Sequence, residues 1–399
     1  MPSQAPAADR RTLPVLPIDG RVQEYAWGSP TVIPRLLGTA PDGSPKAELW
    51  LGTHPAAPAT VAGDGAVPVD TVTGPLPFLL KILAAEKALS LQAHPTPEQA
   101  ADGFARDEAA GIPVDAPHRR YRDRAHKPEL IVALTPFRAL AGIRPAEQTL
   151  AVIDALAVPE LSAAFAPLRE DPGAAGAASV LGALLRLPPD RAAVLVAATL
   201  AAVPRLAGAD PGGDGPLGRA ATLLPQLADA HPGDIGIPTA LLLNDVTLRP
   251  GEALYQPAGM LHAYVRGAGV EIMACSDNVL RGGLTTKHID VDELLGVLDT
   301  TPIVAPVMQP EVTVGPGGER RTWAVPVPDF ALAEVRCDGT APVDVPVTAP
   351  AILLTLDGEV TVTAEGQALP LPRGSAALVV RGPVSLAGTG TVVVASAGS

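Results

Sequence analysis

The order of strand-like and helix-like segments is the feature of this sequence that most limits its fold. From Leu16 to about Pro145, short apolar runs are broken by Gly and Pro, a pattern typical of many short strands. From Ala146 to about Asp234, Ala and Leu recur at helical spacing instead, which predicts four or five helices. Strand-like segments then return and continue to the C-terminus. We therefore expect a mainly β protein interrupted by a helical insertion.

This order also suggests three domains. Residues 14–145 and 235–300 are predicted to form one barrel, and residues 146–234 a helical insertion domain. Residues 301–399 alternate apolar and polar positions between Gly and Pro turns, which predicts a second, small jelly roll. Because no histidine follows His288, this C-terminal domain is expected to lack a metal site and to serve as structural support or a subunit interface.

Composition and charge exclude several classes of function. The 399 residues are 47% apolar, which rules out general disorder. A net charge of −13 argues against nucleic acid or an anionic membrane as the main partner. We find neither a bilayer-spanning run nor an apolar signal core, so we expect a cytoplasmic protein. Two cysteines are too few for a disulfide framework or a Cys-rich zinc site, which leaves His, Glu, Asp or Gln as metal ligands.

Four polar residues on predicted strands are candidate metal ligands. In SLQAHP, Gln92 and His94 are two positions apart, so both side chains point to one face of a strand. Glu129 begins an apolar run, where an unpaired carboxylate would be costly. His262 ends the spacing G-x5-P-x-G-x2-H, which is similar to the second metal motif of a cupin barrel. Such a set would suit zinc with an open position, although a single core histidine is more often simply hydrogen-bonded.

Ionisable residues gather around these candidates. Only five of the 29 basic residues are lysine, and Lys81, Lys127 and Lys287 fall inside the same motif segments. The apolar segment after His262 is unusually rich in polar groups, which is typical of an active site. It contains Glu271, Asp277, Asn278, Arg281 and Lys287.

Three other features are expected to be peripheral or structural. Trp50 is predicted to lie in the core, whereas Trp27 could line the mouth of a pocket. His126, which precedes the predicted strand at Glu129, could line the same pocket or occupy an exposed corner. The Arg-rich loop over residues 106–124 is expected to be solvated.

In combination, these motifs resemble the type I phosphomannose isomerases, zinc enzymes that interconvert mannose 6-phosphate and fructose 6-phosphate. The resemblance runs in order through YAWGS, ELWLGTHP, PFLLKIL, KALSLQAHP, HKPEL, PAGMLHAY and SDNVLRGGLTTKHID. It implies cupin-type jelly-roll barrels, one catalytic and one degenerate at the C-terminus, with the helical insertion. One departure is Thr96, where the family usually has an acidic residue at a helix start, but threonine can still cap a helix.

The resemblance also implies roles for the candidate residues. One zinc ion would be bound by Gln92, His94, Glu129 and His262. Arg281 would be the catalytic arginine. The residues lining the same pocket would be Lys127, Glu271, Asp277 and Lys287.

The chemistry of the family adds finer assignments. Isomerisation through a cis-enediol(ate) needs a proton-shuttling base, for which Lys127 and Glu271 are both candidates. We assign ring opening of the sugar to Asp277 and His126. The phosphate group is expected to contact Lys287, with Lys81 or Arg281 as a further partner.

Other functions are compatible with parts of this pattern. An isomerase of unphosphorylated mannose would differ mainly in the phosphate contacts. A non-catalytic sugar-phosphate-binding cupin is a second alternative. The presence of Arg281 and Lys127 together with all four candidate metal ligands argues against it, because binding alone does not need this set. A cupin oxygenase would favour iron and a more His-rich ligand set. The expected partner is a small sugar phosphate, and the expected state is a monomer or weak homo-oligomer.

Overall fold

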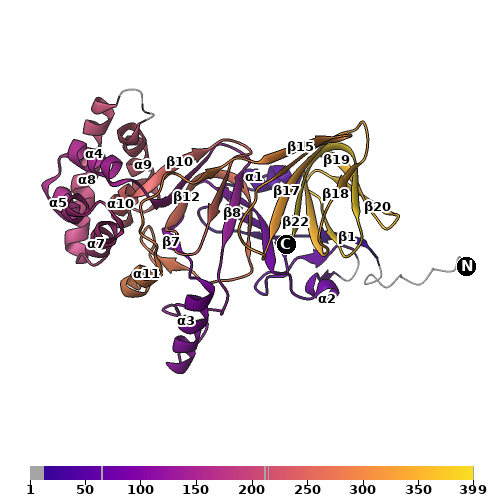
Figure 1. The fold of residues 1–399 in the computed structure, drawn as a ribbon, viewed down its shortest axis with the longest axis horizontal. Helices are drawn as coiled ribbons and strands as arrows, with labels where there is room; N and C mark the ends of the chain where they lie inside the picture. The colour runs from indigo at the N-terminus through magenta and orange to yellow at the C-terminus, as the bar shows by residue number, and fades with distance from the viewer. Residues whose placement is uncertain (1–12, 64–65, 211–212, 214, 399) are drawn as a thin grey trace, which may run out of the picture. The chain divides into compact units, whose positions relative to one another are not determined.

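The computed structural model describes residues 13–63, 66–210, 213 and 215–398 (Figure 1). The chain divides into two compact units. The first contains residues 1–84, 269–275 and 308–399, and the second contains residues 85–268 and 276–307. Strand β12, His262–Ala274, begins in the second unit and ends in the first.

The first unit is built mainly of antiparallel strands. One large sheet has the order β15-β16-β17-β22-β19-β21-β1-β4-β5, with β18 paired to β22 and β20 to β19. Its strands are β1 (Val15–Asp19), β4 (Thr60–Val61), β5 (Val67–Pro68), β15 (Glu311–Gly315), β16 (Gly318–Thr322), β17 (Ala331–Asp338), β18 (Val343–Val345), β19 (Ala351–Ala364), β20 (Gln367–Pro372), β21 (Ala376–Val379) and β22 (Val384–Ser396). The other elements are β2 (Arg21–Gln23), α1 (Val32–Leu36), β3 (Glu48–Gly52), α2 (Asp70–Thr73) and β6 (Phe78–Ala85), which begins in this unit.

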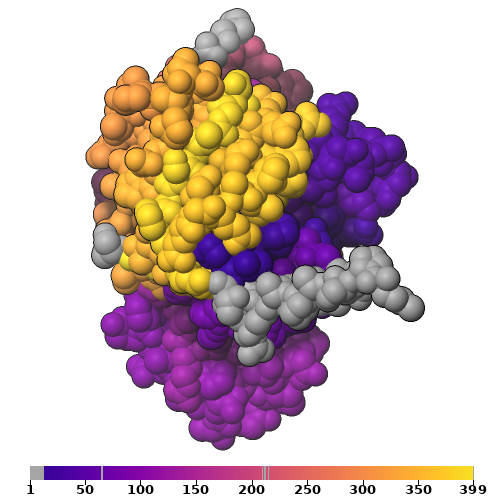
Figure 2. Space-filling view, turned by 90° about the vertical axis from the view of Figure 1, so that its right-hand side faces the viewer, coloured from indigo at the N-terminus to yellow at the C-terminus, as the bar shows by residue number. Residues whose placement is uncertain are grey.

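The large sheet joins the two ends of the sequence. Val15 pairs with Val379 and Ile18 with Ala376, so β1 lies beside β21. Alternate apolar residues of the C-terminal strands, such as Val360 and Val362, form a shared core with Val15. Figure 2 shows yellow C-terminal residues above indigo N-terminal residues of the same unit. The C-terminal segment is therefore β-rich as predicted, while the domain boundaries at residues 145, 234 and 300 stay a prediction.

The second unit combines short strands with the helical insertion. Its strands are β7 (Gln92–Ala93), β8 (Glu129–Ala133), β9 (Phe137–Ile143), β10 (Leu243–Leu248), β11 (Ala253–Gln256), the first half of β12 and β13 (Leu280–Arg281), and β14 (Val307–Met308) lies at its boundary. Its helices are α3 (Pro97–Ala109), α4 (Ala146–Leu156), α5 (Pro159–Ala164), α6 (Ala166–Glu170), α7 (Ala174–Leu185), α8 (Pro189–Ala209), α9 (Pro216–Ala230), α10 (Gly236–Thr239) and α11 (Val291–Val297), with a 3-10 turn at Ala240–Leu242. The described residues between 146 and 234 form six helices rather than four or five, because α5 and α6 are too short to show a helical period.

The insertion helices cover one face of the strands that carry the site. Figure 1 shows α4, α5, α7, α8 and α9 gathered beside β7, β10 and β12. Leu91, Ala93, Ala263 and Val265 belong to the same apolar core as these helices. Because side chains alternate along a strand, Gln92 and His262 project from the opposite face.

Helix α8 is both long and apolar. Residues Pro189–Gly208 are long and apolar enough to cross a membrane by length and composition alone, which is weak evidence because buried core helices also meet this criterion. Leu195, Val196 and Leu206 of α8 pack into the core of the second unit. In this fold α8 is a packing element of the helical insertion.

The Arg-rich loop is largely exposed, as expected, but Asp107, Arg119 and Tyr121 within it are buried. The side chain of Asp107, in α3, is fully buried and accepts hydrogen bonds from the Arg120 guanidinium at 2.6 and 3.0 Å. Arg119 is also buried and donates to the Tyr121 carbonyl at 2.6 Å. The Asp107 carboxylate organises this loop through hydrogen bonds that composition alone could not reveal.

The start of α3 confirms the expectation for Thr96. Its hydroxyl accepts from the Gln99 N–H at 3.2 Å, and the Gln99 side chain accepts from the Thr96 N–H at 2.9 Å. This reciprocal capping box satisfies two N–H groups at the helix start. The acidic residue usual in the family is therefore not needed for capping.

Candidate metal centre and active site

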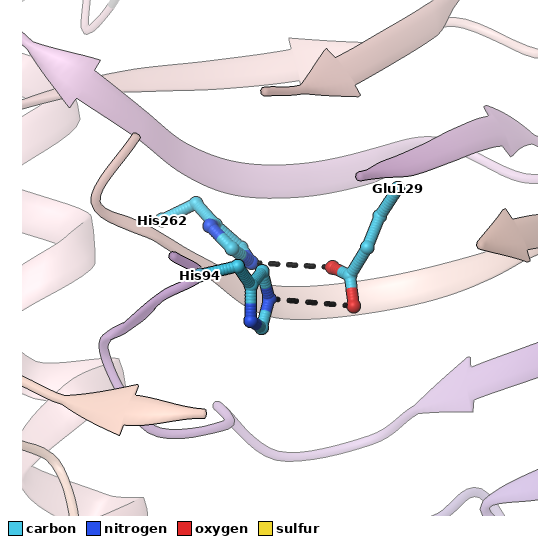
Figure 3. A group of neighbouring side chains, drawn as sticks. All are labelled: His94, Glu129 and His262. Atoms are coloured by element: carbon cyan, nitrogen blue, oxygen red, sulfur yellow. Dashed lines mark ion pairs between the residues drawn. The ribbon is translucent and has the colours of Figure 1, made fainter. Parts of the chain in front are cut away.

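Three predicted ligands meet in the interior of the second unit. His94, Glu129 and His262 are buried, and their donor atoms all lie within 4.8 Å of one another. His94 follows β7, Glu129 is the first residue of β8 and His262 is the first residue of β12. In Figure 3 both imidazole rings point at the Glu129 carboxylate, with Nε2–oxygen distances of 3.4 Å for His94 and 3.3 Å for His262.

The hydrogen bonds of the two rings fix which nitrogen faces the carboxylate. Nδ1 of His94 lies 2.7 Å from the Asn278 carbonyl, and Nδ1 of His262 lies 3.0 Å from the Met260 carbonyl. A carbonyl only accepts, so each Nδ1 carries a proton. Neither buried Nε2 atom forms a hydrogen bond. Burial lowers the pKa of His94 to about 4, with the Glu129 charge acting in the opposite direction, so this ring is neutral near pH 7.

This arrangement fits a cation. The lone pair of a neutral His94 Nε2 faces an ionised carboxylate, and two electron-rich groups at this distance repel unless a positive ion lies between them. Two imidazole nitrogens and a carboxylate oxygen are donors that zinc accepts. Carbonyl acceptors at Nδ1 orient both rings, as is usual for metal-binding histidines.

Glu129 is kept ionised inside the protein. Burial alone would raise the pKa of its carboxyl, but the positive charge of Lys127 holds that pKa well below its usual range. The Lys127 ammonium lies 3.1 Å from Oε1 of Glu129, and Lys127 is a buried residue. Lys127 therefore both stabilises the carboxylate and stands at the edge of the donor group.

Strand register places Gln92 between a candidate ligand and the candidate arginine. Gln92 is opposite His262 on one side and opposite Arg281 on the other. Directly opposite residues of antiparallel strands share a face, with Cβ atoms about 5 Å apart. The small side chain of Ala141, opposite His262 on β9, leaves room beside the imidazole. Gln92 can thus supply a fourth donor, and Arg281 lies two strands from His262.

Three cations form a second feature of this unit. The pKa of Lys287 is lowered by the charge of Arg281, by burial and by Arg122. Burial and the charge of Arg122 lower the pKa of Arg281. Within the described part of the chain, none of these three side chains forms an ion pair. Unpaired clustered cations suit an anionic ligand. Arg122 was not among the sequence candidates because it lies in the Arg-rich loop.

A buried amide network supports this side of the unit. The Asn278 side chain donates to carbonyls of Asp123 and Ala125, both at 2.9 Å, and accepts from the Arg122 N–H at 2.8 Å. Asp123 also accepts from the Ser276 hydroxyl at 2.9 Å. The Asn278 carbonyl, which orients His94, is therefore held by a fully bonded side chain. Sequence reasoning noted Asn278 as part of a polar run but assigned it no role.

The two residues assigned to ring opening flank this network. Asp277 is exposed, and its backbone N–H donates to Asp123 at 2.8 Å. His126 is half-buried and comes directly before Lys127. The structure thus brings both residues to the segments that carry the cations and the metal donors, and their role in ring opening stays a prediction.

The remaining candidates lie in the first unit. The Lys81 ammonium is 3.0 Å from Glu271 and 3.6 Å from Glu48, and the three side chains are buried together. Trp50 donates its indole N–H to Glu48 at 2.7 Å, and Lys81 lies over its ring at 5.2 Å. Trp50 is a core residue as expected, while Glu48 was missed.

Trp27, the last substrate candidate, also lies in this unit. It stacks on Tyr25 with ring centroids 5.8 Å apart. The functions of Trp27, Lys81 and Glu271 stay predictions.

The β-rich fold and the buried His–Glu–His group define a cupin-type metal-binding protein. Residues 15–146 match the family model described as the catalytic domain of type I phosphomannose isomerase. The mannose-6-phosphate isomerase of Escherichia coli strain K12 is 36% identical over 333 residues, which span 78% of this chain and 81% of that protein. The Rattus norvegicus enzyme of the same name is 34% identical over 87% of this chain and 88% of its own length. The chain belongs to the type I phosphomannose isomerase family.

A solved structure agrees with this membership over the whole fold. Mannose 6-phosphate isomerase from Salmonella typhimurium, bound to fructose 6-phosphate and zinc, superposes with a TM-score of 0.84 at 32% identity. The match covers 97% of this chain and 100% of that one. The family and cupin-type fold expected from the motifs are thereby confirmed.

Proposed function

We propose that this protein is a zinc-dependent mannose-6-phosphate isomerase that interconverts D-mannose 6-phosphate and D-fructose 6-phosphate. The observation that carries the proposal is the pair of buried imidazole Nε2 atoms, without hydrogen bonds, that face the Glu129 carboxylate. Family membership supplies the reaction and the sugar phosphate. The reaction would serve mannose use or GDP-mannose synthesis, in the cytoplasm.

The proposed zinc ligands are Gln92, His94, Glu129 and His262. When bound, zinc supplies a Lewis acid that polarises the sugar carbonyl. With one anionic ligand the site keeps a net charge of about +1, which favours an anionic oxygen on the substrate. Lys127, placed 3.1 Å from Glu129, holds that carboxylate ionised.

The other side chains would handle protons and the phosphate. Arg281 stays protonated and would stabilise the negative charge of the cis-enediol(ate), a role that needs a fixed cation rather than a base. The proton between the two carbons would be carried by Lys127 or Glu271, and both remain candidates. Ring opening would use Asp277 and His126.

The substrate phosphate would bind the three unpaired cations. The positive charges of Arg122 and Arg281 lower the pKa of Lys287, and that of Arg122 lowers the pKa of Arg281, which is the repulsion that a bound dianion would relieve. Lys81 is the weaker candidate, because two buried carboxylates already neutralise its ammonium. Trp27 stays a candidate for contact with the sugar.

A coupled assay tests this function. The purified protein should convert mannose 6-phosphate to fructose 6-phosphate, and equimolar mannose should react far more slowly. Lys287→Ala should weaken use of the phosphorylated sugar and leave the slow reaction of mannose unchanged. Equal rates with both sugars would favour the isomerase of unphosphorylated mannose, and no turnover with either would refute the proposal.

A further inference from the structure

The turn between Arg281 and Lys287 contains one residue, Leu284, in a backbone conformation that its side chain disfavours. Leu284 has φ of +53°, in the left-handed region where a Cβ is disfavoured. Gly283 has φ of +124°, and a Cβ there would lie 2.7 Å from Cα of Gly236. Something outside the turn must therefore stabilise this conformation.

Backbone hydrogen bonds with Leu91 hold Gly282 and Gly283. The N–H groups of the next two residues bond to one carboxylate, that of Asp234 at the end of the helical insertion. Oδ1 of Asp234 accepts from the N–H groups of Leu284 at 2.8 Å and Gly236 at 2.6 Å. Oδ2 accepts from the Thr285 N–H at 2.9 Å. Asp234 thus bonds to both sides of the close contact between Gly236 and the turn.

The constraint continues from Thr285 to the lysine. The Lys287 N–H donates to the Thr285 hydroxyl at 3.1 Å, so Lys287 is one contact beyond the residue that Asp234 holds. Arg281 is fixed differently, because it pairs with Gln92 in the sheet. Arg281 and Lys287, which repel each other, are therefore positioned by different contacts. Arg281 is held by strand pairing, and only Lys287 depends on Asp234.

We propose that Asp234 is a positioning residue of the anion site, which holds the Gly282–Lys287 turn so that Lys287 converges with Arg281 on a phosphate group. The inference rests on the proposed function in that it takes this cation cluster as the phosphate site. It gives the helical insertion, which carries no other candidate residue, a defined contact with the site.

The test compares phosphate affinity in five proteins: the wild type, two single variants, their double variant and a control variant. Asp234→Asn keeps the size of the side chain but replaces one acceptor oxygen by an N–H donor and removes the charge. By calorimetry, its dissociation constant for inorganic phosphate should rise roughly tenfold, because a displaced charged contact costs about that factor. Zinc per chain should be unchanged. In the isomerase assay KM should rise more than kcat falls.

A double-mutant cycle separates positioning from general damage. In a Lys287→Ala background, Asp234→Asn should change the phosphate affinity by less than about twofold, because the group it positions is gone. Asp210→Asn is the matched control, since Asp210 also accepts from three backbone N–H groups, those of Gly213, Gly215 and Gly218. It should leave phosphate affinity at the wild-type value.

Two outcomes would overturn the inference. One is an equal loss of affinity with and without Lys287, and the other is unchanged affinity in the single Asp234→Asn variant. A wild-type protein that binds no phosphate would also overturn it, together with the phosphate site. A protein that binds phosphate but does not isomerise mannose 6-phosphate would contradict only the proposed function.

Discussion

Proton binding at His94 should make the metal-free protein sensitive to mild acid. The buried ring has a pKa of about 4, whereas a histidine in an unfolded chain titrates near 6.5. Between these two pH values the His94 side chain binds a proton in the unfolded chain but stays neutral in the folded protein. The free energy of unfolding therefore falls as pH decreases through this window.

The magnitude follows from the two pKa values. Their difference corresponds to about 3 kcal/mol of unfolding free energy, of which about 2 kcal/mol is lost between pH 7 and pH 5. The side chain is fully buried, so no solvent screening reduces this figure. Glu129 also loses its stabilising effect as pH falls, but only at lower pH than His94, because the pKa of its carboxyl is held well below the usual range.

Urea unfolding of the chelated protein at pH 7, 6 and 5 measures this effect. The wild type should lose about 2 kcal/mol over the range, whereas His94→Gln should lose much less. His118→Gln, at an exposed position, is the control and should follow the wild type. The same pH dependence in the wild type and in His94→Gln would refute the reasoning.

Further predictions concern single side chains of the site. His262→Ala should lose its zinc on desalting, and a full zinc complement would exclude it as a ligand. Arg281→Ala should keep zinc while turnover falls about 10²- to 10³-fold, as expected for loss of a charge-stabilising donor, and retained turnover would rule out its role. Asn278→Ala should lower zinc affinity about 10- to 100-fold by freeing the carbonyl that orients His94, measured by competition with a chelator.

The metal donors were predictable because their local patterns are strong. Gln92 and His94 are two residues apart, a spacing that predicts one face if both lie on a strand, and Glu129 is an anion at the start of an apolar strand. Both signals are visible in the sequence, although in the structure His94 lies just after β7. The structure confirms that His94, Glu129 and His262 converge. What the sequence could not show is the tautomer, which depends on carbonyls of Met260 and Asn278.

The supporting residues were not predictable for a physical reason. Asp234, Asp123 and Glu48 act through contacts with backbone groups or side chains distant in the sequence, and an isolated aspartate in a loop has no pattern that marks such a partner. The same holds for Arg122, whose neighbours in the sequence are mostly charged. Long-range topology, such as the pairing of β1 with β21, is likewise set by the folded sheet and not by any local motif.

The central claim is that one bound zinc ion per chain makes this protein a mannose-6-phosphate isomerase. The most direct test is to remove metal with a chelator, add zinc back in steps and follow fructose 6-phosphate formed from mannose 6-phosphate. The rate should be near zero after chelation, rise in proportion to added zinc and level off at about one ion per chain. Full turnover in the metal-free protein would contradict the claim.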